Sequence, residues 1–95
     1  MYALKIKEEA DKLLAKLSKK NSPLILALNK KIFEIRQNPF HSYKFLRPPL
    51  AGYNRVHIEK SFVLIFKISH SLRIVEVFWF AHHDEVYKWR PKNID

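Results

Sequence analysis

The spacing of apolar residues predicts a short strand followed by a helix at the start of the chain. Residues 2–6 alternate between apolar and other side chains, as in a strand. Apolar residues then recur at helical spacing and predict a helix over residues 8–19; they are Ala10, Leu13, Leu14 and Leu17. Acidic residues in the first turn, which suit the positive end of a helix dipole, support this start; they are Glu8, Glu9 and Asp11.

A second helix is predicted between Ser22 and Pro39. Ser22 can cap its first turn, and Pro23 suits its first position, where no amide donor is needed. Its apolar stripe consists of Ile25, Leu28, Ile32 and Ile35. Asn38 precedes a proline, which pushes it out of helical space, so we expect an α-hairpin over residues 8–37.

The second half of the chain predicts strands. Three apolar runs lie at residues 53–58, 62–68 and 72–80, with short turns between them, which favours an antiparallel meander. Residues 38–50 contain three prolines and predict a loop or an irregular edge segment. Residues 84–95 predict a charged, aromatic tail with room for one helical turn.

The order β-α-α-β-β-β predicts an α+β fold in a single domain over residues 1–95. We expect an N-terminal strand and an α-helical hairpin packed on a small twisted antiparallel sheet. The matching periodicities predict that core residues of the strands contact core residues of the helices: Val56, Ile58, Leu64 and Phe66 against Ala10, Leu13, Leu14, Leu17, Leu28 and Ile32. The other face of the sheet is expected to stay open as a shallow, basic concavity.

The charge balance points to the kind of partner. The 95 residues include 18 Lys and Arg against 9 Asp and Glu, which gives a formal net charge of +9. Such a charge steers a small domain toward polyanions, namely nucleic acid, an anionic membrane or an acidic protein segment. A basic surface that only keeps the protein in solution is the simpler alternative.

The absence of cysteine favours a reducing compartment, because secreted domains of this size often need disulfides. It also excludes Cys-ligated zinc and thiol nucleophiles. Charged residues follow Met1 too soon for a signal peptide, and the longest apolar runs, 62–66 and 77–81, are too short to cross a bilayer. We therefore expect a cytoplasmic protein without a membrane partner.

Three motifs carry a resemblance to a known family. L-R-P-P-L-A-G-Y-N-R-V at residues 46–56 is similar to the L-x-x-x-L-x-G-x-x-R-V/I pattern that leads into the second strand of RelE/ParE superfamily toxins. F-V-L-I-F-K-I at residues 62–68 resembles the family's Y-R-L/V-I/V-Y-x-I strand, and A-H-H-D-E-V-Y at residues 81–87 resembles its closing h-R-x-x-V/I-Y. With the opening strand and helix, the resemblance spans nearly the whole chain.

The resemblance implies a RelE-like fold and a toxin of a type II toxin–antitoxin system. Many RelE-type members enter the ribosomal A site and cut mRNA, whereas ParE-type members inhibit DNA gyrase without being enzymes. The implied partners are a RelB-like antitoxin, in an assembly such as a toxin–antitoxin heterotetramer, and the ribosome with its mRNA. A catalytically decayed toxin that only binds its antitoxin is a third alternative. No cofactor is implied.

RelE-type cleavage proceeds without metal by attack of the RNA 2′-OH on the adjacent phosphate, which needs a base, cations and an acid. Because side chains alternate along a strand, Tyr53, Arg55 and His57 should share the open face. The resemblance places Arg55 and His57 at basic positions of the active strand. Arg55 suits phosphate, and His57 suits a base or an acid. A solvated face without function is the alternative.

The end of the last strand supplies the remaining catalytic candidates. The resemblance matches His83 to a family arginine, His82 to a histidine that some members carry, and Tyr87 to a C-terminal tyrosine. We interpret one histidine as an acid or base, and expect no metal site because neither Cys nor helical His spacing supports one. Tyr87 is expected to stack on a base or donate a proton, or else to pack the tail onto the sheet.

Further residues are candidates for RNA binding. Lys44 and Arg47, in the loop before the second strand, would contact phosphates. Trp89 and Arg90 would stack on a base, or else pack on the sheet or meet the antitoxin.

Two departures from the family pattern concern arginines. Val63 stands where the family strand has arginine, and Ala81 lies near a position where some RelE proteins carry one. Valine and alanine cannot hold a phosphate, so these departures keep the gyrase alternative open.

Overall fold

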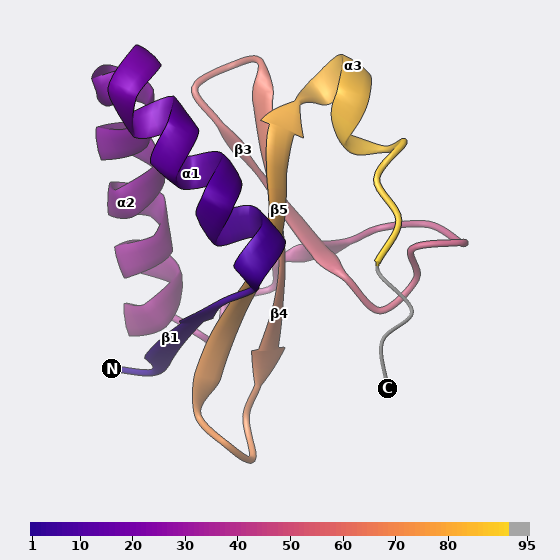
Figure 1. The fold of residues 1–95 in the computed structure, drawn as a ribbon. Coiled ribbons are helices and arrows are strands. Elements are labelled where there is room, and N and C mark those ends of the chain that lie inside the picture. Colours follow the sequence, from indigo (N-terminus) through magenta and orange to yellow (C-terminus); the bar gives the residue numbers. More distant parts are fainter. Residues whose placement is uncertain (92–95) are drawn as a thin grey trace.

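The computed structural model describes residues 1–91, which form a layer of helices on one five-stranded sheet (Figure 1). The elements in chain order are β1 (Ala3–Ile6), α1 (Glu8–Lys20), α2 (Ser22–Gln37), β2 (Lys44–Phe45), β3 (Asn54–Ile58), β4 (Phe62–Ser69), β5 (Ile74–His82) and α3 (His83–Val86). The predicted α+β fold is confirmed. The last part of the predicted tail, residues 92–95, lies outside the described residues. No helix within residues 1–91 is both long and apolar enough to cross a membrane.

The sheet has the strand order β1-β5-β4-β3-β2 and is mixed. Strands β2 to β5 pair antiparallel, which confirms the predicted meander. β1 instead joins the edge of the sheet parallel to β5, with Lys5 opposite Glu76. Lys5 and Lys7 place their Nζ atoms 3.8 and 3.4 Å from a carboxylate oxygen of Glu76, so unlike charges favour this position of β1.

The predicted helical hairpin is confirmed, but its internal cap differs from the prediction. Asn21, rather than Ser22, caps α2: its side-chain oxygen accepts a hydrogen bond from the backbone N–H of Leu24 at 3.2 Å. Ser22 is the first helical residue, and Pro23 follows within the first turn. Asn and Ser are equally good caps, so a sequence with both side by side does not choose between them.

The main core lies between the two helices and one face of the sheet. All ten of the predicted contact residues belong to it, either fully buried or partly buried against it. Ala10, Leu28 and Leu64 have no exposed surface. The alternation of β3 and β4 and the apolar stripes of α1 and α2 therefore predicted this interface correctly.

The opposite face is not the open concavity that the sequence predicted, because a second apolar cluster covers its middle. The buried members of this cluster are Leu46, Leu50, Val63, Ile65, Phe78, Val86 and Trp89. The loop before β3 and the segment after β5 fold over this face (Figure 1). A register shift between β4 and β5 pairs Ile65 with Trp79 and Phe66 with Val77, which leaves Phe78 as the extra residue of a bulge.

Replacement of Leu64 by Ala should lower the free energy of unfolding by about 2–5 kcal/mol, because it leaves a cavity in the main core. Urea denaturation measures this change. Leu72→Ala is the matched control, since Leu72 is 69% exposed and its loss should change stability by no more than about 0.5 kcal/mol. Equal effects of the two substitutions would show that the core is misplaced.

Candidate nucleic-acid interface

A hollow of about 370 Å³ lies beside the second cluster and brings several of the predicted site residues together. Arg47, Arg55 and Tyr87 line it, and its walls are completed by Phe45, Leu46, Pro48, Pro49 and Leu50. None of these residues is acidic. The hollow therefore combines two guanidinium groups and a phenol with an apolar wall, which suits a phosphate attached to an apolar or aromatic group.

The loop that forms one wall of the hollow is fixed to the sheet by its backbone. The N–H of Leu46 donates to the carbonyl of Tyr53 at 2.8 Å, and the N–H of Leu50 donates to that of Arg47 at 2.9 Å. The buried amide of Asn54 also donates to the carbonyls of the chain before the loop, Tyr43 and Lys44, at 3.4 Å each. These bonds hold Arg47 close to β3.

Arg55 is flanked by another cation. In the pairing of β2 with β3, Lys44 lies directly opposite Arg55, and Lys44 is exposed. Residues directly opposite in an antiparallel pair project to the same face. Arg47 and Arg55 therefore line the hollow, and Lys44 lies across the strand pair from Arg55. Their role as phosphate contacts stays a prediction.

His57 lies apart from this hollow. It alternates to the same side of β3 as Arg55 and pairs with Val63 of β4, but its side chain is exposed. It lines a hollow of about 350 Å³ with residues of α2, including Lys30, Lys31 and Glu34. Lys31 donates to Glu34 at 2.9 Å; this hydrogen bond and the charge of Lys31 lower the pKa of Glu34, so Glu34 stays ionised near His57 at neutral pH.

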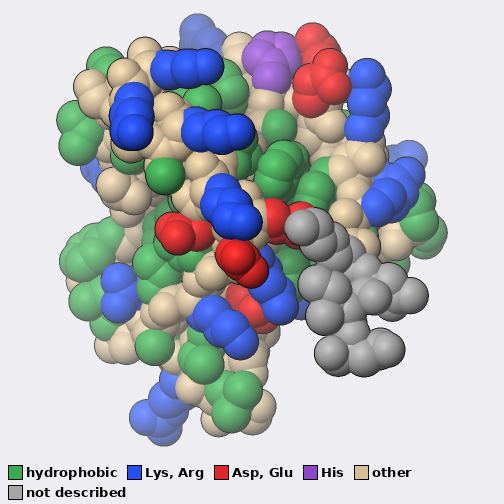
Figure 2. Space-filling view, viewed as in Figure 1, with side chains coloured by type: hydrophobic (Ala, Val, Ile, Leu, Met, Phe, Trp, Pro, Cys, Tyr) green, Lys and Arg blue, Asp and Glu red, His purple; other side chains and the backbone are tan. Residues whose placement is uncertain are grey.

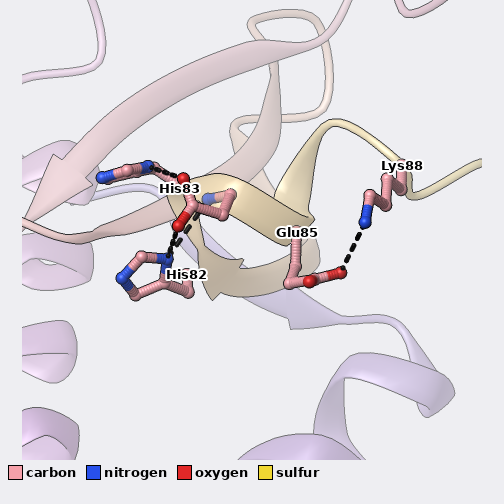
Figure 3. Close-up of polar contacts among 5 residues, drawn as sticks. His82, His83, Glu85 and Lys88 are labelled. Carbon is pink, nitrogen blue, oxygen red and sulfur yellow. Dashed lines mark hydrogen bonds and ion pairs between the residues drawn. The ribbon is translucent and has the colours of Figure 1, made fainter.

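His82 and His83 form a third group, together with Asp84, where β5 meets α3 (Figure 3). His83 Nδ1 lies 2.9 Å and His82 Nδ1 lies 3.4 Å from the two carboxylate oxygens of Asp84. The two rings are 4.5 Å apart. Asp84 was not identified as a site residue from the sequence. Its position directly after a pair of histidines, at the predicted start of a helical turn, could have pointed to it.

In the segment after α3, Tyr87 and Arg90 lie on the surface and Trp89 is buried. Tyr87 is 42% exposed and lines the hollow, which leaves its ring accessible. Trp89 is only 8% exposed, and its ring packs edge-on against Tyr53, with ring centroids 5.5 Å apart. The structure therefore shows Trp89 packed on the sheet, and its ring is not accessible for stacking on a base. Arg90 is exposed and donates to the backbone carbonyls of Tyr87 and Trp89, both at 2.8 Å.

The positions of the two missing family arginines now have a structural explanation. Val63 has no exposed surface and belongs to the second cluster, and Ala81 packs against the same cluster. An arginine at Val63 would displace the apolar contacts with the segment after α3. Neither position therefore offers a cation on this face; Arg47 and Arg55 instead line the hollow beside the second cluster.

Comparison with known proteins supports one class. No family model matches the sequence. The chain resembles solved toxins of toxin–antitoxin systems: the RelBE2 toxin–antitoxin complex of Mycobacterium tuberculosis (TM-score 0.71, 22% identity, 86% of this chain and 98% of that chain) and a metal-bound toxin from Helicobacter pylori (TM-score 0.75, 20% identity, 90% and 99%). These likenesses establish a RelE-like fold.

The sequence relationship is closer. A protein of Methanocaldococcus jannaschii that bears the name toxin RelE4 is 48% identical over 88 residues, which are 93% of this chain and 93% of that protein. The chain therefore belongs to the RelE family, within the RelE/ParE superfamily of toxins of type II toxin–antitoxin systems. The family assigned from the sequence motifs is confirmed.

Replacement of Val63 by Arg, which restores the family's residue, should lower the free energy of unfolding by about 3–5 kcal/mol, the range for an uncompensated buried charge. Leu72→Arg introduces the same side chain at an exposed position and should have little effect. Urea denaturation of both variants measures the difference. A Val63→Arg protein as stable as the parent would show that the second cluster does not cover this position.

Proposed function

We propose that this RelE-family toxin is a ribosome-dependent mRNA endonuclease that stops translation. The observation that carries the proposal is the hollow lined by Arg47, Arg55 and Tyr87, which has Lys44 beside it and no carboxylate among its lining residues. A strand of mRNA offers what such a hollow accepts, a phosphate with a base next to it. The net charge of +9 supports the approach to RNA.

The proposed reaction is attack of a 2′-OH on the adjacent phosphate, with loss of the 5′-oxygen and without a metal. Arg55, with its forked donors, holds the phosphate and stabilises the negative charge that grows on it in the transition state. Arg47 and Lys44 fix the neighbouring phosphates. Tyr87 stacks on a base or donates a proton from the edge of the hollow.

The proposed proton transfers fall to the histidines. Tyr87, which lines the hollow, directly follows the four-residue helix α3, whose first residue is His83, so about 6 Å of helix rise separates the backbone of these two residues. His57 lies two residues from Arg55 on the same strand, although it lines a different hollow. We therefore assign the base and the acid to these imidazoles, His57 on β3 and His82 or His83 beyond β5.

The proposed partners are the ribosome with its mRNA and a RelB-like antitoxin, and the proposed compartment is the cytoplasm, where translation occurs. An acidic or amphipathic antitoxin segment would neutralise the rim of cations, in a complex such as a heterotetramer. The M. tuberculosis relative was solved as a toxin–antitoxin complex, which supports an antitoxin partner. No cofactor is part of this proposal.

A second candidate function, inhibition of DNA gyrase without catalysis, is favoured by one observation. Val63 stands where the family strand has arginine, Ala81 lies near a position where some RelE proteins carry one, and Val63 is fully buried. One experiment separates the candidates: purified protein is added to translating ribosomes with primer extension on the mRNA, and in parallel to a gyrase supercoiling reaction. New cuts at A-site codons with unaffected supercoiling support the nuclease; the reverse supports the inhibitor.

Arg55→Ala should reduce cleavage in the ribosome assay on the order of 10²–10³-fold, because the variant loses a contact with charge that grows in the transition state. The loss should fall on turnover as well as on affinity. Lys16→Ala is the control, since it removes one positive charge from the exposed side of α1. Figure 2 shows that Lys and Arg are spread over the face that carries α1. An equal loss of cleavage in both variants would show that Arg55 contributes only through the overall charge of the protein.

His57→Gln should leave the fold intact, because His57 is exposed, and lower the cleavage rate on the order of 10²–10⁴-fold if this imidazole is the base or the acid. The dependence of the rate on pH around neutrality should flatten at the same time. His41→Gln, an exposed histidine outside the set, is the control. An unchanged pH–rate profile in His57→Gln would assign proton transfer to His82 and His83 alone.

A further inference from the structure

We propose that His82, His83 and Asp84 form a binding site for a divalent transition-metal cation of the zinc type. The three residues are consecutive and lie where β5 ends and α3 begins (Figure 3). One ligand atom from each, a ring nitrogen or a carboxylate oxygen, lies within 4.8 Å of the other two. The proposed cleavage needs no metal, so the cation is not its catalyst.

The contacts of Asp84 with the two histidines are close in length to the spacing of ligand atoms around a zinc ion. Asp84 Oδ2 lies 3.4 Å from His82 Nδ1, and Asp84 Oδ1 lies 2.9 Å from His83 Nδ1. Tetrahedral zinc with bonds of about 2.0–2.1 Å holds neighbouring ligand atoms about 3.3 Å apart. The side chains of His83 and Asp84 are exposed and can rotate to complete the arrangement.

His82 Nδ1 faces the backbone of Asp84 as a hydrogen-bond acceptor. The backbone N–H of Asp84 donates to this nitrogen at 3.2 Å, and an accepting imidazole nitrogen is the kind of atom that binds a metal. Asp84 Oδ2 lies 3.4 Å from the same nitrogen. A cation bound by His82 Nδ1 and Asp84 would replace one long hydrogen bond.

The ring of His82 and the backbone of His83 are fixed by contacts with the start of β4. The His82 ring packs edge-on against Phe62 at 5.6 Å, and the backbone N–H of His83 donates to the carbonyl of Ser61 at 2.7 Å. Both contacts join the β5–α3 junction to the start of β4, and this preorganisation reduces the entropy that binding costs.

The donor set selects the kind of cation. Two imidazole nitrogens with one carboxylate oxygen suit zinc, copper or nickel, whereas magnesium and calcium prefer oxygen ligands alone. Three protein ligands leave a fourth position for water. If the proposed function holds, an occupied site also withdraws both imidazoles from proton transfer; metal binding itself does not depend on that function.

Isothermal titration of zinc chloride into the metal-free full-length chain tests the site without reference to activity. We expect saturable binding of one zinc per chain, an affinity about tenfold or more lower in both Asp84→Asn and His83→Gln, and no saturable binding of magnesium chloride. His41→Gln, which removes a histidine elsewhere, should bind zinc like the parent. Circular dichroism confirms that each variant is folded.

Three results would overturn the proposal. They are absence of saturable zinc binding, binding of unchanged affinity in the folded Asp84→Asn and His83→Gln variants, and loss of binding in His41→Gln. Because the titration needs neither ribosome nor RNA, a protein that binds zinc but leaves mRNA uncut would contradict the proposed nuclease and leave the metal site in place.

Discussion

Burial of β4 on both faces of the sheet is the constraint on which the rest of the structure depends. Four consecutive residues, Val63 to Phe66, have no exposed surface. Leu64 and Phe66 face the helices, whereas Val63 and Ile65 face the second cluster. A strand that is apolar on both sides needs cover on both sides, so the loop before β3 and the segment after β5 must fold onto the sheet.

This cover decides where chemistry can take place. Val63, Val86 and Trp89 are buried in the cluster on this face. The candidate site residues lie beside it: Arg47 and Arg55 border one hollow, and the histidines lie toward the ends of β3 and β5. The missing arginines are therefore part of how this chain packs. The proposed nuclease would bind the phosphate at the edge of β3, and α3 would link that place to the imidazoles of His82 and His83.

Most of the fold could be predicted from the sequence, because helical and alternating spacing are local signals that survive folding. The pairing of β1 with β5 and the second cluster could not, since both depend on contacts between distant segments, such as Trp89 with Tyr53. The bulge at Phe78 could not be predicted from the sequence either. Strict alternation would put Phe78 and Trp79 on opposite faces of the sheet, whereas both contact the second cluster. Among site residues, motif order located Arg55 and Tyr87, which line one hollow, whereas the separate surroundings of His57 and the role of Asp84 required three-dimensional contacts.

The proposed activity of this RelE-family toxin is cleavage of mRNA by attack of the RNA's own 2′-hydroxyl. The most direct measurement uses an mRNA with a single 2′-deoxyribose at the nucleotide whose hydroxyl would attack, placed in the A site of a stalled ribosome. A 2′-deoxyribose at this one nucleotide leaves the phosphate and the base in place and removes only the attacking hydroxyl. The account predicts that the unmodified mRNA is cut and the modified one is not, at that position. Cutting of both mRNAs at equal rates would contradict it, as would a failure to cut either.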